Sequence, residues 1–153
     1  MKTFKEADIL LPGKEVNMEK WSVIACDQFT SEPEYWQEVK KFAGDSPSTL
    51  DMILPEVYLE QENHEEQLKN IEASMNKYLR EKVFTEYKDA MIYVERTDSV
   101  GNVRAGIVGK IDLEQYDYSK KSTSFIRATE ATVAERIPAR VEIRNNAVVE
   151  LPH

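Results

Sequence analysis

The strongest pattern in this chain is a stripe of apolar side chains that follows Asn63. Its members are Leu68, Ile71, Met75, Tyr78 and Leu79. Steps of three and four residues keep side chains on one face of an α-helix, and Asn63 followed by Glu66 marks a helix start. The opposite face is rich in Glu and Lys. The sequence therefore predicts an amphipathic helix of about five turns with one solvated face.

A second helix and a β-hairpin accompany this segment. Ser31 and Glu34 form a Ser-x-x-Glu capping box, in which Ser31 caps a helix that Gly44 ends. Residues 90–96 and 103–111 are apolar runs on either side of a turn, which predicts a hairpin. Two main amphipathic helices with a mixed β-sheet that includes a hairpin indicate the α+β class.

The remaining segments give weaker patterns. Residues 7–11 predict a short strand before a Pro-Gly turn, and residues 21–26 are a compact apolar run that predicts a buried strand. Residues 125–138 predict a helix in part, ended by Pro138. The tail that begins at Val141 alternates apolar and polar residues.

Composition bounds the class of protein. The chain has 153 residues, enough for one domain, and a formal net charge of −8. Acidic charge argues against partners such as nucleic acid and anionic membrane surfaces. Cys26 is the single cysteine, and the sequence has neither a signal-peptide apolar region nor an apolar run of roughly 20 residues. These features predict a cytoplasmic protein.

Charge is distributed unevenly along the chain. Residues 1–118 carry 14 basic and 24 acidic side chains, whereas residues 119–153 carry six basic and four acidic ones. Four of the seven arginines lie between positions 127 and 144. Because the arginine fork suits bidentate binding of phosphate or carboxylate, this segment is a candidate for binding an anion.

The richest cluster of chemical groups is in that segment. Arg127, Arg136 and Arg140 are candidate phosphate ligands, Thr129 supplies a hydroxyl and Glu130 is the candidate catalytic base. Ion pairs between Arg and Glu that tie a loop to the sheet would account for the same residues. The composition of the segment leaves both interpretations open.

Polar residues after the apolar run at 21–26 form a second candidate. Asp27 and Gln28 follow Cys26 at the end of the predicted strand, where ligand groups gather in open α/β sheets. Cys26 itself fits a buried structural cysteine better than a nucleophile, because His64 and His153 are isolated. No His or Cys spacing matches a zinc site, so no metal site is predicted.

Four stretches together resemble a known family. They are residues 7–12, residues 21–31 with 35–36, residues 47–59, and residues 126–130 with 135–140. In their order and in their residues they are similar to the N-terminal part of the bacterial family catalogued as domain of unknown function 1015. The resemblance covers essentially the whole chain.

This resemblance implies a distant relation to the ParB/sulfiredoxin-like superfamily, which includes nucleotide-hydrolysing proteins and free-serine kinases. Family members are typically more than twice this length and carry a downstream Asp-Gly-His/Asn-His motif that resembles a phosphate-handling signature. That motif is absent here, so we expect a single domain over residues 1–153 that is the N-terminal portion of a longer protein. The resemblance also carries residues 127–130 over as site candidates.

Two functional hypotheses follow. The first is a domain that binds a nucleotide or phosphorylated small molecule, with Mg²⁺ if the ligand is ATP, as the incomplete part of a phosphotransferase or nucleotide hydrolase. The second is a non-catalytic interaction module whose acidic surface meets a protein partner or a second copy in a homodimer.

Overall fold

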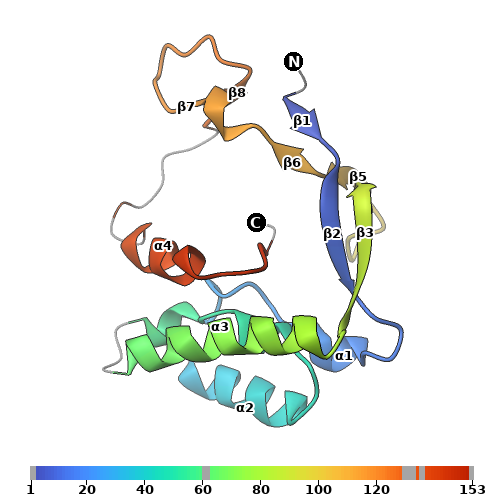
Figure 1. The fold of residues 1–153 in the computed structure, drawn as a ribbon, viewed down its shortest axis with the longest axis vertical. Helices are drawn as coiled ribbons and strands as arrows, with labels where there is room; N and C mark the ends of the chain where they lie inside the picture. Colours follow the sequence, from blue (N-terminus) through green and yellow to red (C-terminus); the bar gives the residue numbers. More distant parts are fainter. Residues whose placement is uncertain (1–2, 60–62, 129–133, 135–136, 152–153) are drawn as a thin grey trace. The chain divides into compact units, whose positions relative to one another are not determined.

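The computed structural model describes residues 3–59, 63–128, 134 and 137–151 (Figure 1). The chain forms two compact units. A sheet unit combines residues 1–11 and 85–132, and a helical unit combines residues 12–84 and 133–153. Helices and short strand pairs occur together, which confirms the α+β class.

Helices dominate the helical unit. They are α1 (Met18–Trp21), α2 (Pro33–Ala43), α3 (His64–Arg80) and α4 (Ile137–Asn145), with 3₁₀ segments η1 (Thr49–Met52) and η2 (Glu56–Tyr58). The predicted five-turn helix is α3, and its stripe is the buried face, because Ile71, Met75 and Tyr78 are all buried. Apolar spacing alone was sufficient to predict this element.

The second predicted helix is α2, but Ser31, its predicted cap, does not cap it. Pro33 is its first residue, which makes Glu32 the N-cap, and no side chain makes a capping hydrogen bond there. Pro33 fixes the start because its φ suits the first helical position and its missing N–H costs nothing there. Ser31 therefore does not cap the helix. Gly44 ends it as predicted, with a φ of 58° that favours glycine.

The predicted strand at residues 21–26 is wrong. Trp21 is the last residue of α1, and Asn17 caps that helix by accepting the backbone N–H groups of Glu19 and Lys20 at 3.0 and 3.3 Å. Residues 22–25 have no strand pairing. A short apolar run fits a buried strand and a buried helix end equally well, and here Trp21 supplies the burial.

The expected helix end at Pro138 is also wrong. Pro138 is the second residue of α4, where a proline is tolerated because first-turn N–H groups have no helical acceptor. Val141 and Ile143 consequently lie on this helix and not in an alternating extended tail.

One cluster forms the core of the helical unit. Trp21, Met52, Leu54, Ile71, Met75 and Tyr78 pack together. Ile143 of α4 and residues 147, 149 and 151 after it are partly buried against this cluster. Trp21 and Tyr78 also contact Phe84, with ring centroids 5.6 Å and 6.4 Å from it respectively. Residues 143–151 thus contribute to a core built mostly by residues 21–84.

Strands of the sheet unit are arranged in pairs. Antiparallel pairs join β1 (Phe4–Lys5) to β6 (Lys110–Ile111) and β4 (Ile92–Thr97) to β5 (Val103–Val108), and a parallel pair joins β7 (Tyr116–Asp117) to β8 (Ile126–Arg127). The predicted strand near residue 7 is β2 (Ala7–Pro12), which pairs with β3 (Phe84–Ala90). A further 3₁₀ segment, η3, covers Leu113–Gln115.

The predicted hairpin is the β4–β5 pair. Asp98 shapes its turn, because its Oδ1 accepts the backbone N–H groups of Val100 and Asn102, each at 2.9 Å. The hydrogen bond from the Asn102 side-chain amide, followed by these backbone hydrogen bonds, lowers the pKa of the Asp98 carboxyl. Gly109 ends the ladder, where an added Cβ would lie 2.5 Å from the Lys5 carbonyl oxygen. That glycine permits the close backbone approach of β1.

Candidate functional site

The structure divides the predicted site residues into three groups. Thr129, Glu130 and Arg136 lie outside the described residues. Arg127 is in the sheet unit, whereas Asp27, Gln28 and Arg140 belong to the helical unit. Asp27, Gln28 and Arg140 can therefore be considered together as parts of one site, and Arg127 is considered separately.

Arg127 lies on β8 and is exposed. Its Nε donates to the carbonyl oxygen of Ser124 at 3.0 Å, and Ser124 in turn donates its hydroxyl to the carbonyl of Gln115. These contacts hold the loop before β8, so Arg127 has a structural role that does not need a ligand.

Arg140 takes part in a contact between distant parts of the helical unit. From α4, its Nη2 bonds Oε1 of Glu56 at 2.9 Å. The Glu56 side chain is 8% exposed, while that of Arg140 is 46% exposed. The backbone N–H of Glu56 donates to the Cys26 carbonyl oxygen at 2.9 Å. Residues 26, 56 and 140 therefore meet, and we call them the Cys26–Glu56–Arg140 cluster.

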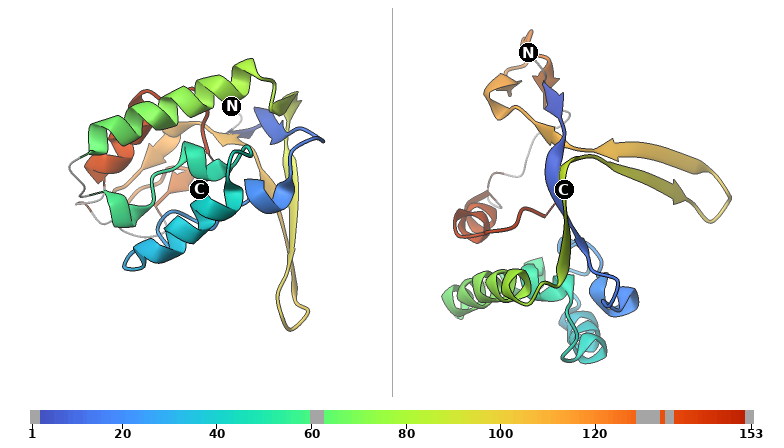
Figure 2. Two further views of the ribbon diagram at one scale, coloured as in Figure 1. Left: turned by 90° about the horizontal axis from the view of Figure 1, so that it is seen from below. Right: turned by 45° about the vertical axis from the view of Figure 1, so that its right-hand side comes forward.

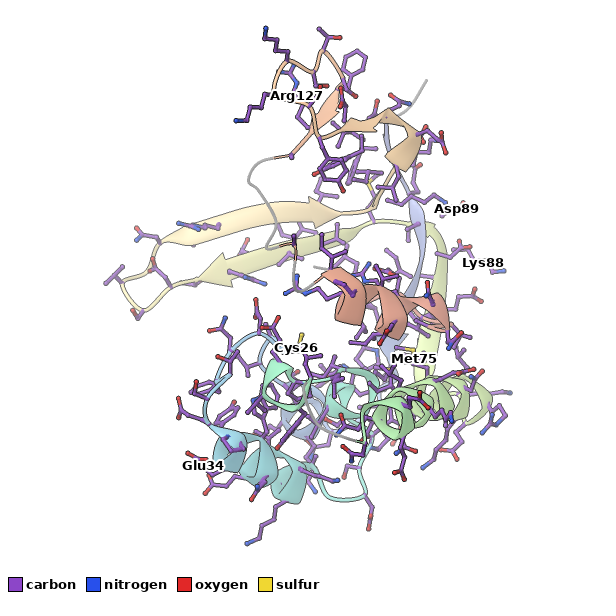
Figure 3. All side chains as sticks on the ribbon, turned by 90° about the vertical axis from the view of Figure 1, so that its left-hand side faces the viewer. Cys26, Glu34, Met75, Lys88, Asp89 and Arg127 are labelled. Atoms are coloured by element: carbon purple, nitrogen blue, oxygen red, sulfur yellow. The ribbon has the colours of Figure 1, made fainter. Side chains whose placement is uncertain are left out.

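Figure 3 labels Cys26, whose thiol is affected by the charges of this cluster. Burial is the main cause of its raised pKa, the negative charges of Asp27 and Glu56 raise it further, and the charge of Arg140 partly opposes them. The thiol thus stays protonated at neutral pH and is a poor nucleophile. This agrees with the interpretation of Cys26 as a structural residue.

The Arg140 guanidinium is the group in the cluster best suited to a ligand. Glu56 engages one of its nitrogens, and no described residue bonds its Nε or Nη1. A guanidinium has a rigid fork of donors that fits phosphate and carboxylate oxygens. The nearly buried Glu56 holds this fork in place while part of it faces solvent.

The loop that carries Asp27 and Gln28 is held by aromatic side chains. Phe29 has a φ of 51°, which is uncommon for a bulky residue, and its ring stacks on Tyr35 with centroids 4.0 Å apart. Its carbonyl oxygen accepts the indole N–H of Trp36 at 3.3 Å. Asp27 and Gln28 are exposed on this loop, and the Gln28 amide donates to Asp27 Oδ1 at 3.3 Å.

Sequence reasoning missed Glu56. The sequence feature that could have identified Glu56 is its position as an isolated carboxylate inside the apolar stretch from Leu54 to Leu59. A charge buried there requires a partner. The partner lies 84 residues away, and no local pattern identifies it.

A shallow cavity of about 280 Å³ lies beside α2. Its apolar lining comes from Val23, Ile24, Tyr35, Val39 and Phe42. None of the predicted site residues contributes to it, so it is separate from the Cys26–Glu56–Arg140 cluster.

The described residues hold neither a metal-ligating group nor a membrane-spanning helix. Within these residues no group of three or more His, Cys, Asp or Glu side chains is placed to hold a metal ion. None of the helices that the structure describes has the length and apolar character needed to cross a bilayer.

A comparison with known protein families finds a match that covers most of the chain. A family model described as a protein of unknown function, DUF1015, matches residues 10–153. Neither the curated proteins nor the solved structures contain a match to the chain.

Proposed function

We propose that this chain, which belongs to the DUF1015 family, binds a nucleotide or another phosphorylated small molecule through the solvent-facing edge of Arg140. The observation that carries the proposal is the Arg140–Glu56 pair, in which a nearly buried carboxylate anchors a half-exposed guanidinium. Anchoring removes much of the side-chain entropy that a free surface arginine would lose on binding a ligand.

Groups around Cys26 support the same ligand class. Asp27, Glu56 and Arg140 all act on the Cys26 thiol, so they lie around one point of the helical unit. The Arg140 fork offers donors to phosphate oxygens, and the exposed Gln28 amide and Asp27 carboxylate offer polar contacts to neutral groups such as ribose hydroxyls. Among the described residues, Arg140 beside the carboxylates of Asp27 and Glu56 favours a ligand that combines an anionic group with hydroxyls over a bare polyanion.

The catalytic part of the proposal rests on residues outside the described ranges and on the resemblance. Glu130 would act as a base, and Thr129 and Arg136 would add contacts to phosphate, in a ParB/sulfiredoxin-like phosphotransferase or nucleotide hydrolase. Mg²⁺ would accompany ATP, because that ion commonly binds through substrate phosphates. A cytoplasmic location, where nucleotides are abundant, belongs to the same proposal.

Calorimetric titration with ATP, ADP and CTP, each with and without Mg²⁺, tests the binding step. We expect binding by the wild type and at least a roughly tenfold loss of affinity in Arg140→Lys, which keeps the charge but not the fork. Arg144→Lys is the matched control, because Arg144 lies one turn further along α4 and pairs with the exposed Glu150. Absence of binding, or equal affinities in the two variants, would refute the proposal.

A second candidate function has its own observation. On the β4–β5 hairpin, Tyr93, Val103 and Ile107 are 64%, 58% and 60% exposed. Apolar side chains gathered on one ribbon favour a non-catalytic interaction or dimerisation module. A stable dimer in light scattering, together with no affinity for any nucleotide in the titrations, would favour this alternative.

A further inference from the structure

We infer that the outer edge of β5 is a self-association site, at which two copies of this chain pair their β5 strands antiparallel around Ala105. This inference rests on the second candidate function, for which it names the partner and the contact. It does not depend on the proposed anion site, since all its residues belong to the sheet unit.

The β4–β5 hairpin has two open edges. Each of its strands pairs with the other and with no other described strand. Figure 2 shows the pair as a long ribbon of two strands. A two-stranded ribbon is marginally stable in water, and an unpaired edge is a template for another strand. Added strands would therefore stabilise this hairpin.

Hydrogen bonding at the turn identifies the groups on the β5 edge. The Asp98 N–H donates to the Asn102 carbonyl oxygen at 3.0 Å, so this pair directs its backbone groups into the hairpin. Because inward and outward pairs alternate along an antiparallel ladder, the N–H and C=O groups of Val103, Ala105 and Ile107 point outward. The three residues with free backbone groups are also the apolar ones on one face of β5.

A second copy complements this edge in a specific register. With Ala105 opposite Ala105 of the other copy, Val103 lies opposite Ile107 and Arg104 lies opposite Gly106, twice by symmetry. Tyr93 is the cross-strand neighbour of Ile107 within each copy, so an apolar row continues across the junction. The register opposes no like charges, and an added Cβ at Gly106 meets nothing within 4 Å, which leaves room beside Arg104.

Charge distinguishes β5 from the other edge. The centre of β4 carries two adjacent charged residues, Glu95 and Arg96, whereas Arg104 is the single charged residue of β5. Charged side chains on an edge strand oppose pairing with a further chain. The β5 edge is therefore less protected against pairing with another strand. A second copy of this chain is the partner that matches its pattern of apolar residues.

The contact between the two β5 strands is small, which indicates a weak dimer. Six-residue strands with their flanking side chains bury less area than a standard protein interface of about 1,600 Å². We therefore expect a weak dimer that forms in the micromolar range, and the test must cover a wide range of concentrations.

Sedimentation velocity of the 153-residue chain, from about 5 μM to about 1 mM, measures this equilibrium. Ala105→Pro removes an outward N–H from each copy without touching the bonds of the hairpin, and we expect it to weaken the dimer at least roughly tenfold. Thr97→Pro is the control, because it removes an outward N–H from the β4 edge, and we expect less than about a twofold change. A monomer at every concentration, or equal effects of the two prolines, would overturn the inference.

Oxidative cross-linking tests the register independently of stability. Directly opposed residues in an antiparallel pair have Cα atoms roughly 5.5 Å apart, which suits a disulfide. In a Cys26→Ser background, we expect Ala105→Cys to form a covalent dimer and Thr97→Cys to remain monomeric. A dimer that cross-links through Thr97→Cys but not through Ala105→Cys would contradict pairing through β5.

Discussion

Replacement of Tyr78 by phenylalanine should destabilise the helical unit. The Tyr78 ring is 4% exposed, and its hydroxyl accepts the backbone N–H of the fully buried Ser48 at 2.9 Å and donates to Asp51. Phenylalanine keeps the ring packing but leaves the Ser48 N–H buried without this partner. A stranded donor costs about 1–3 kcal/mol and a lost hydrogen bond costs about 1 kcal/mol more. We therefore expect a loss of about 2–4 kcal/mol in the free energy of unfolding.

Urea unfolding followed by tryptophan fluorescence is a suitable assay. Both tryptophans, Trp21 and Trp36, are buried in the helical unit, so their emission reports its unfolding. Tyr58→Phe is the matched control, because its hydroxyl donates to the Pro33 carbonyl at 3.3 Å in an exposed position, and we expect a loss below about 1 kcal/mol. Equal losses in the two variants would refute the role assigned to the buried hydroxyl.

Alkaline pH provides a second readout of the same group. Burial, followed by the hydrogen bond to Asp51, raises the pKa of Tyr78 well above its usual range. Above pH 10 or so the unfolded chain ionises this tyrosine while the folded protein keeps it neutral, so the stability of the wild type falls. The phenylalanine variant lacks this contribution. The stability difference between wild type and variant should therefore shrink as the pH rises above about 10.

Three further predictions concern other parts of the chain. Arg140→Gln should slow the reaction of Cys26 with a disulfide reagent at pH 8, because the arginine charge lowers the pKa of that thiol; an unchanged rate would contradict the placement of the guanidinium. Gly109→Ala should destabilise the sheet unit by about 2 kcal/mol, because its Cβ would press on backbone, whereas Gly106→Ala should change the free energy by less than about 0.5 kcal/mol; circular dichroism during urea unfolding measures both. The hydrogen bonds that lower the pKa of Asp98 stabilise the hairpin turn above the usual carboxyl pKa and are lost as the pH falls through the lowered value. The amide chemical shifts of the turn should therefore move over that acidic range in wild type and not in Asp98→Ala.

Sequence patterns predicted the elements in which apolar residues recur over a long segment. Most of the stripe of α3 is buried as predicted, because Ile71, Met75 and Tyr78 each face the core, whereas Leu79 is 39% exposed. The β4–β5 hairpin was equally clear from two apolar runs around a turn. Where the run was short, as at Trp21, apolar character did not distinguish a strand from the end of a helix.

The candidate site was harder to predict, because its residues meet through a long-range contact. Arg140, Asp27 and Gln28 were selected for their chemistry, and the structure relates Arg140 to Cys26 through Glu56, which no pattern had singled out. The contact between Glu56 and Arg140, which are 84 residues apart, depends on how α4 packs. The sequence around either residue does not indicate this contact.

The order of the two units along the chain has a consequence for synthesis on the ribosome. Residues 12–84 supply most of the helical core, but the segment from α4 to Leu151 that completes it is made only after the whole sheet unit. Translation proceeds at about 5–20 residues per second, so the core stays partly uncovered for several seconds. Neither unit can be released by a single cut, because a break after residue 84 separates each unit into two pieces. The helical unit is therefore expected to complete its folding only once residues 133–151 have been made, after the whole sheet unit.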